Sequence, residues 1–263
     1  MSARPGELAT RPAPAVPGEP LRVVALGDSI SSGDGVGVLT PPDRTWTALL
    51  AGWLAPTQYV SLAAAGAKVR DVLAGQLPPT ADLRPHLVTL CVGLNDLVKT
   101  DCGPRLTTDL TALLVGLRAA GATVVVTRLH DPGAVFRMPR GLAAQVTARV
   151  ALVNAVVDQI AATDPGVLPV DLGVLVAEPA CWAVDRVHPS AWGQAVLART
   201  AASRLGLAPP PHETAPPPPP GGLAHAAWVV RSGLPWLARR CGEVGPAVGG
   251  MAVSTVRRTP SSP

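Results

Sequence analysis

Short apolar runs alternate with amphipathic stretches over most of the first 205 residues. The runs are continuous and rich in β-branched residues, which is typical of strands buried on both faces of a sheet. They predict five strands, at residues 21–27, 58–63, 86–92, 122–128 and 167–171. Helical periodicity between them predicts helices near residues 44–54, 68–76, 105–120, 140–162 and 190–205. Strands that alternate with helices indicate an α/β fold, with a parallel sheet covered on both faces.

Candidate functional residues follow three of these predicted strands. Ser29 comes after the first strand, Gly66 after the second and Asn95 after the third. In open parallel sheets, ligands bind at the carboxyl ends of the strands. We therefore expect these three residues to meet at one edge of the sheet.

Ser29 lies in the sequence Gly27-Asp28-Ser29, where the first apolar run stops abruptly. A serine at such a strand-to-loop turn has an exposed hydroxyl on a rigid backbone, as a nucleophile requires. Glycine, aspartate and serine are also ordinary turn residues, so this motif alone fits a plain turn equally well.

Gly66 and Asn95 are candidate hydrogen-bond donors to a negatively charged oxygen. Small residues around Gly66 would let a backbone N–H approach a ligand closely, although a tight connection has the same composition. The carboxamide of Asn95 is a donor that does not titrate, although it also suits a turn that caps the next segment. We interpret Asp28 and Asp96 as structural residues that bond neighbouring loops.

An acidic residue and a histidine lie three positions apart in Asp185-Arg186-Val187-His188. This spacing can place a carboxylate beside one imidazole nitrogen and leave the other nitrogen for a serine. A single histidine is more often a surface or core residue, so the pattern needs the other segments to carry weight. The sequence does not decide whether Arg186 faces substrate or solvent.

In this order, the four segments resemble the SGNH (GDSL-type) hydrolase family, over roughly residues 20 to 205. The family's four letters correspond to Ser29, Gly66, Asn95 and His188, and its acidic partner corresponds to Asp185. The similarity extends to a bacterial lipase/esterase subgroup. Two positions depart from the family pattern: Ile30 replaces a leucine, and Ala63 stands where many relatives carry asparagine.

The resemblance implies a flavodoxin-like, three-layer α/β/α sandwich around a five-stranded parallel sheet. It also implies that Ser29 is a nucleophile, His188 its base and Asp185 the residue that orients the imidazole. The oxyanion hole would then consist of the backbone N–H groups of Ser29 and Gly66 together with the Asn95 side chain.

Three functions remain open from the sequence. The first is a carboxylester hydrolase of the lipase, esterase or O-deacetylase type, acting through an acyl-enzyme. The second is an acyl-thioester hydrolase or acyltransferase with the same triad, and the third is a non-catalytic binding module. The filled site positions argue against the third, whereas the apolar Val135, Phe136 and Met138 fit either an acyl pocket or a loop anchor.

Other chemistries have little support in the sequence. The histidines lack metal-ligand spacing, and no Cys-x-x-Cys pair occurs, so we expect neither a metal nor a cofactor. The glycine-rich segment 33–37 is not a phosphate-binding loop, and the Gly-x-Ser-x-Gly elbow is missing. A net charge of +4 without an Arg/Lys cluster in the domain makes a nucleic-acid partner unexpected. The partner is therefore an ester substrate, and the oligomeric state is left open.

Residues 1–20 contain no apolar core of a signal peptide, and no segment reads as a membrane span, so we expect a cytoplasmic location. Free thiols are then the expected state of the four cysteines. Cys91 reads as a small buried hydrophobe, whereas Cys102 and Cys181 flank the site in sequence, where a bridge between them is the alternative.

We divide the chain into a disordered segment (1–20), a catalytic domain (21–207), a proline-rich linker (208–222) and a tail (223–263) that carries Trp and Arg residues. We favour a tail that packs back onto the domain or dangles. A weak contact of residues 223–240 with an anionic membrane surface is the alternative.

Overall fold

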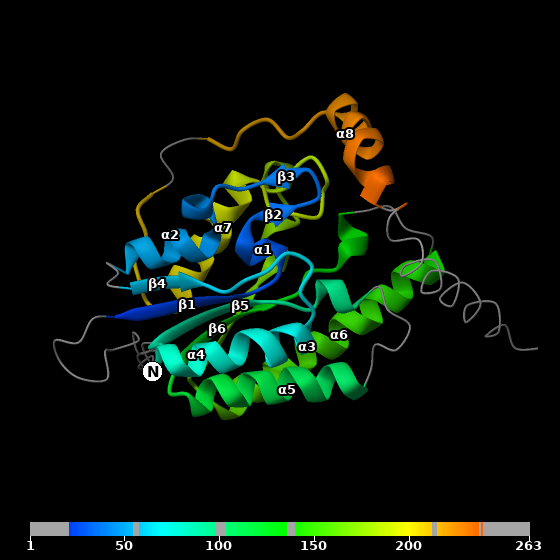
Figure 1. The fold of residues 1–263 in the computed structure, drawn as a ribbon. Helices are drawn as coiled ribbons and strands as arrows, with labels where there is room; N and C mark the ends of the chain where they lie inside the picture. The colour runs from blue at the N-terminus through cyan, green and yellow to red at the C-terminus, as the bar shows by residue number, and fades with distance from the viewer. Residues whose placement is uncertain are drawn as a thin grey trace, which may run out of the picture.

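Five parallel strands form the central sheet of the protein (Figure 1). The computed structural model describes residues 21–54, 58–97, 104–135, 140–211, 215–236 and 238. The strands are β1 (Arg22–Gly27), β4 (Gln58–Ser61), β5 (Leu87–Cys91), β6 (Thr123–Arg128) and β7 (Val167–Asp171). Their order, β4-β1-β5-β6-β7, is the flavodoxin-like order. The five predicted strands and the α/β fold are confirmed.

Helices cover both faces of the sheet and complete the predicted three layers (Figure 1). On one face lie α2 (Trp46–Trp53) and α7 (Ala191–Arg204), which pack on each other. The other face is covered by α5 (Pro104–Ala119), α6 (Arg140–Thr163) and a continuous helical stretch made of α3 (Val69–Asp71), the π-helical turn Val72–Gln76 and α4 (Leu77–Leu83).

The core explains why the strands read as unbroken apolar runs. Val24 and Leu26 of β1 and Leu90 of β5 are almost completely buried, because helices cover both faces of their sheet. With 3% aromatic residues in the chain, aliphatic side chains fill most of this core. Trp46 at the start of α2 is the largest wholly buried side chain.

One helical segment among the described residues, Ala143–Thr163 in α6, is long and apolar enough to cross a membrane by length and composition alone. Here α6 packs against β6 and β7. Arg128 of β6 also forms an ion pair with Asp158 of α6, with 3.0 Å between Nε and Oδ1. The buried side chains along this stretch of the helix are Val146, Val150, Val153, Val156 and Val157. In this fold, α6 is therefore a covering helix of the sheet.

Two short elements near Ser29 are absent from the sequence prediction. The helical turn α1 (Ser29–Ser32) follows β1 directly. A small hairpin, β2 (Asp34–Gly35) with β3 (Val38–Leu39), then rises from the same edge of the sheet. We call residues 34–39 the hairpin.

The tail also contains structure: α8 (Gly222–Trp228) continues into the π-helical turn Val229–Gly233, and both lie against the domain (Figure 1). Several sequence predictions lie outside the described residues. They concern residues 1–20, Cys102, Phe136, Met138 and residues 239–263.

A buried histidine, His130, packs against the segment that contains Trp182. His130, two residues beyond β6, is 4% exposed and packs against Trp182 with 4.9 Å between ring centroids. Burial lowers the pKa of His130 to about 4, although Asp131 and Asp171 oppose this shift. His130 is therefore neutral at physiological pH.

We expect His130 to make stability depend on pH between 6.5 and 4. In this window the unfolded chain binds a proton at His130 that the folded chain excludes. The contribution of neutral, buried His130 to the free energy of unfolding is therefore present above pH 6.5 and is lost as pH falls toward 4. The loss reaches about 3 kcal/mol. Urea unfolding at several pH values should show a flatter stability profile for His130→Phe than for wild type. Parallel profiles would contradict this assignment.

Candidate active site

The backbone at the end of β1 holds Ser29 at the carboxyl edge of the sheet. Gly27 has φ +121°, and a Cβ at this position would overlap the Cys91 carbonyl oxygen, so the position requires glycine. Asp28 caps α1 by accepting a hydrogen bond from the Ile30 N–H at 3.0 Å, and its own N–H donates to the Cys91 carbonyl. Ser29 is therefore the first residue of a helical turn anchored to the neighbouring strand.

His188 connects Ser29 to a buried carboxylate. Its Nε2 lies 2.8 Å from Ser29 Oγ, and its Nδ1 lies 2.5 Å from Asp185 Oδ2. The Asp185 side chain is 1% exposed, and the His188 side chain is 12% exposed. Asp185 Oδ1 accepts hydrogen bonds from the N–H groups of Val187 and His188, at 2.9 and 3.0 Å. Both carboxylate oxygens of Asp185 thus have defined partners.

The loop from Trp182 to Ser190, which we call the triad loop, is held closed at its base. Trp182 and Pro189 form an antiparallel bridge, and the Trp182 indole N–H donates to the Leu175 carbonyl at 3.0 Å. Ser190 caps α7 through its hydroxyl, which accepts from the Gly193 N–H. These bonds fix the direction in which the imidazole points.

Gly66 and Asn95 lie on the two loops beside Ser29. Gly66 has φ +77° in the tight turn after β4, a conformation that favours glycine. The turn that carries Asn95 follows β5, and Asn95 Nδ2 donates to the Ala67 carbonyl at 3.1 Å. The neighbouring Asp96 accepts from the Val69 N–H at 3.1 Å and ties the two loops together.

The second N–H of Asn95 points toward Asp28, the residue that precedes Ser29. Asn95 Nδ2 lies 3.4 Å from Asp28 Oδ2, which is long for a hydrogen bond. This N–H is therefore the donor that can turn to an oxyanion at least cost. Burial raises the pKa of Asp28 to about 7, although the Ile30 N–H and nearby His188 lower it.

The structure thus brings all five predicted site residues to one edge of the sheet. Ser29, His188 and Asp185 form one hydrogen-bonded chain. Asn95 contacts the residue before Ser29 and the residue after Gly66. The expectation that Asp28 and Asp96 bond neighbouring loops agrees with these contacts.

The sequence did not indicate two glutamines that hydrogen-bond to the backbone on either side of Ser29. Gln76 pairs with both backbone groups of Gly27, accepting from its N–H at 2.8 Å and donating to its carbonyl at 3.0 Å. Gln194 of α7 accepts from the Trp46 N–H and donates to the Ile30 carbonyl. The only signal for either was a polar residue inside an otherwise apolar helix face.

The hairpin covers one side of the imidazole, which the sequence also did not reveal. A Cβ built on Gly35 would lie 2.7 Å from His188 Nδ1, so the hairpin backbone packs directly on the ring. A larger residue at position 35 would push against the imidazole.

Neither described cysteine has the properties of a reactive thiol. Cys91 and Cys181 are free and buried. Burial raises the pKa of Cys91 well above its ordinary range and that of Cys181 to about 11, helped by the nearby charges of Asp28 and Glu178 respectively. Among the described residues, no group of three or more His, Cys, Asp or Glu side chains is placed to hold a metal ion.

Comparison with known proteins relates this chain to hydrolases. The model of the GDSL-like Lipase/Acylhydrolase family matches residues 25–196. Among solved structures, the acetylxylan esterase Axe2 from Geobacillus stearothermophilus has 21% identity and a TM-score of 0.55, over 72% of this chain and 95% of that one. TesA has 22% identity and a TM-score of 0.54, over 70% and 97%. No curated protein matches the chain.

Proposed function

This chain belongs to the GDSL-like lipase/acylhydrolase family and is a serine ester hydrolase, and we propose that Ser29, His188 and Asp185 are its catalytic triad. The observation that carries the proposal is the continuous chain of hydrogen bonds from Ser29 Oγ through the imidazole to Asp185 Oδ2. Nucleophile, base and orienting carboxylate are recognised by this geometry.

In the first half-reaction, Ser29 Oγ attacks the ester carbonyl carbon while its proton passes to His188 Nε2. The carbonyl π electrons move to oxygen and form the tetrahedral intermediate. Asp185 stabilises the imidazolium and keeps Nδ1 protonated. When the intermediate collapses, the C–O bond to the leaving group breaks, His188 returns the proton to that oxygen, and the alcohol leaves an acylated Ser29.

In the second half-reaction, His188 takes a proton from water as the water oxygen attacks the acyl carbon. Collapse of this intermediate breaks the bond to Ser29 Oγ, which recovers a proton from His188. The products are a carboxylic acid and free enzyme, and the triad returns to its starting state.

Three donors complete the proposed oxyanion hole. The Ser29 N–H lies at the start of α1, where backbone N–H groups have no partner within the helix. The Gly66 N–H lies in the tight turn after β4, and the carboxamide of Asn95 supplies the third donor. Fixed donors of this kind stabilise the charge that develops in the transition state.

We expect Asn95→Ala to lower kcat about 10²–10³-fold and to leave measurable activity, because one of three donors is lost. Asn154→Ala is the matched control: this carboxamide pairs with the Leu129 backbone from α6 and is not part of the triad or the proposed oxyanion hole. It should cost stability and leave kcat of the folded protein unchanged. Equal losses from Asn95→Ala and Ser29→Ala would count against the assigned roles.

The substrate class that we propose is a carboxylic ester, cleaved in the manner of an esterase, lipase or O-deacetylase. The fold shared with an acetylxylan esterase makes acetyl esters the first substrates to test. The decisive comparison is kcat/KM for an acetate ester and the matching thioacetate ester. A preference for the oxygen ester supports the proposal, and a strong preference for the thioester would replace it with acyl-thioester hydrolysis.

A further inference from the structure

The end of the described chain lies against the hairpin and the triad loop, which flank the candidate active site. Residues 215–236, which we call the C-terminal cap, comprise an extended proline-rich stretch, α8, the π-helical turn Val229–Gly233 and a final turn at 234–236. The cap lies beyond the residues that match the family model. In Figure 1 it is the orange segment beside the hairpin, at the edge of the sheet that carries Ser29.

The cap is attached to the hairpin on one side of the site. The Trp228 indole N–H donates to the Val36 carbonyl at 2.6 Å. One residue further, a Cβ on Gly37 would lie 2.8 Å from the Ser232 Cβ, so the two backbones approach closely. The hairpin itself packs on the His188 ring through Gly35.

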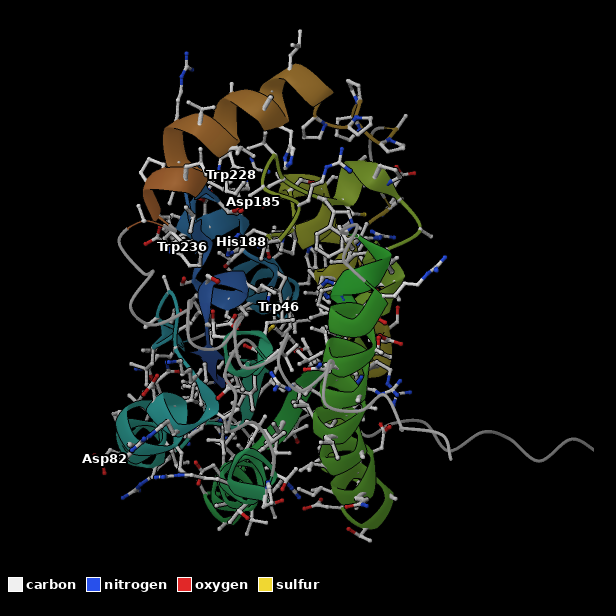
Figure 2. The ribbon with its side chains drawn as sticks, turned by 90° about the vertical axis from the view of Figure 1, so that its right-hand side faces the viewer. Trp46, Asp82, Asp185, His188, Trp228 and Trp236 are labelled. Carbon is white, nitrogen blue, oxygen red and sulfur yellow. The ribbon has the colours of Figure 1, made fainter. Side chains whose placement is uncertain are left out.

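The cap is attached to the triad loop on the other side. His225 Nδ1 donates to the Val184 carbonyl at 2.6 Å, and Val184 directly precedes Asp185. The His225 and Trp228 rings stack with 5.8 Å between centroids, so the two attachments form one unit. In Figure 2, Trp228 lies on the side of the cap nearest to Asp185 and His188. The cap therefore bridges the two walls that flank the triad.

The proline-rich start of the cap roofs a cleft beside the triad loop. Pro219 and Pro220 face Val135, Trp182 and Arg186 across a cavity of about 120 Å³. The walls are mostly apolar, and the exposed Arg186 side chain lines the cleft. Residues of the cap and of the triad loop thus line one cleft.

The helical part of the cap buries little of its surface. No residue of α8 or of the Val229–Gly233 turn is fully buried. On the outer side, the side chains of Leu223, Val230 and Leu234 are 90%, 65% and 53% exposed. Segments with few buried contacts open at low free-energy cost.

We propose that the C-terminal cap is a specificity-determining wall of the substrate site, which limits the bulk of the ester groups that reach Ser29. The inference rests on the proposed function. Trp228 is its central residue, because its indole both donates to Val36 and stacks on the His225 ring that bonds the triad loop. On this proposal, a bulky acyl or alcohol group would require the cap to move away from the site, whereas a small group would not.

The test compares Trp228→Ala, Trp228→Phe and Val230→Ala with wild type in the full-length protein. Trp228→Phe keeps an aromatic ring, although a smaller one, and removes the donor to Val36. Val230→Ala changes an exposed side chain of the same segment. One substrate series lengthens the acyl group of p-nitrophenyl esters from acetate to octanoate. The other enlarges the alcohol of acetate esters from phenol to naphthol. Hydrogen exchange of the hairpin amides measures cap closure without reference to activity.

We expect Trp228→Ala to raise the ratio of kcat/KM for bulky over small esters about tenfold in one of the two series, with a smaller rise for Trp228→Phe and none for Val230→Ala. Hairpin amides should exchange faster in both Trp228 variants. A ratio equal to that of wild type in both series would overturn the proposal, as would equal losses on small and bulky esters. If wild type hydrolyses no ester, the proposed function fails. Hairpin amides that exchange at the wild-type rate in both Trp228 variants would overturn closure by the cap, whatever the activity.

Discussion

We expect Ser29→Ala to lower kcat for ester hydrolysis by roughly 10⁶-fold, since nucleophile and base act as one unit. The serine side chain is held between the α1 turn and His188 Nε2, 2.8 Å away, and alanine removes the attacking oxygen without disturbing the backbone. Activity that remains would reflect the oxyanion donors alone. Initial rates with an acetate ester measure the loss.

Two further variants make this result specific. His188→Ala should lose about as much activity, and the double variant little more, because the effects of such a unit are not additive. Ser32→Ala alters a serine of the same helical turn whose hydroxyl accepts from the Asp34 N–H instead, and it should retain activity. A Ser29→Ala protein within a hundredfold of wild type would contradict the assignment of the nucleophile.

We expect Asp185→Asn to lower kcat by about 10⁴-fold while the fold is kept. Asp185 Oδ1 accepts two backbone N–H groups, so the carboxamide oxygen of asparagine will occupy that position. Its NH₂ group then faces His188 Nδ1, which must become an acceptor. The imidazole proton moves to Nε2, and Nε2 can no longer accept the proton of Ser29.

Asp164→Asn is the matched control for this change, because it removes a carboxylate that follows α6 and pairs with Arg118 near the end of α5. Its kcat should equal that of wild type. Thermal unfolding of both variants separates loss of chemistry from loss of fold. An Asp185→Asn variant within tenfold of wild type would show that the carboxylate does not set the tautomer of His188.

The strands were predictable because helices bury both of their faces. A strand such as β5 is then an unbroken apolar run, which has a clear signal in the sequence. The helix predicted at residues 68–76 instead continues to Leu83, past two prolines. It does so because Pro78 and Pro79 lie at the start of α4, where a missing backbone N–H costs little.

The catalytic candidates were predictable from short motifs, whereas the parts that hold them were not. Gln76 and Gln194 act through backbone partners far away in sequence, at Gly27 and Ile30, and no local pattern reveals such pairs. The hairpin is too short for a periodic signal. The cytoplasmic location, the domain limits and membrane contact through residues 223–240 stay predictions.

The position of the cap depends on two hydrogen bonds between segments separated in sequence, from Trp228 to Val36 and from His225 to Val184. From the sequence, a tail that packs on the domain and one that dangles look alike, because both follow a proline-rich stretch. The described part of the tail, residues 223–236, lies on the domain because the Trp228 indole and the His225 imidazole donate to carbonyl groups on both walls of the site.

The central claim is that Ser29 is a nucleophile activated by His188, and a fluorophosphonate probe tests it most directly. Purified wild type and the Ser29→Ala and His188→Ala variants are incubated with the probe, and the labelled peptide is identified by mass spectrometry. We expect one adduct on Ser29 in wild type and none in either variant. A folded wild-type protein that takes up no label, or a label on another residue, would contradict the account.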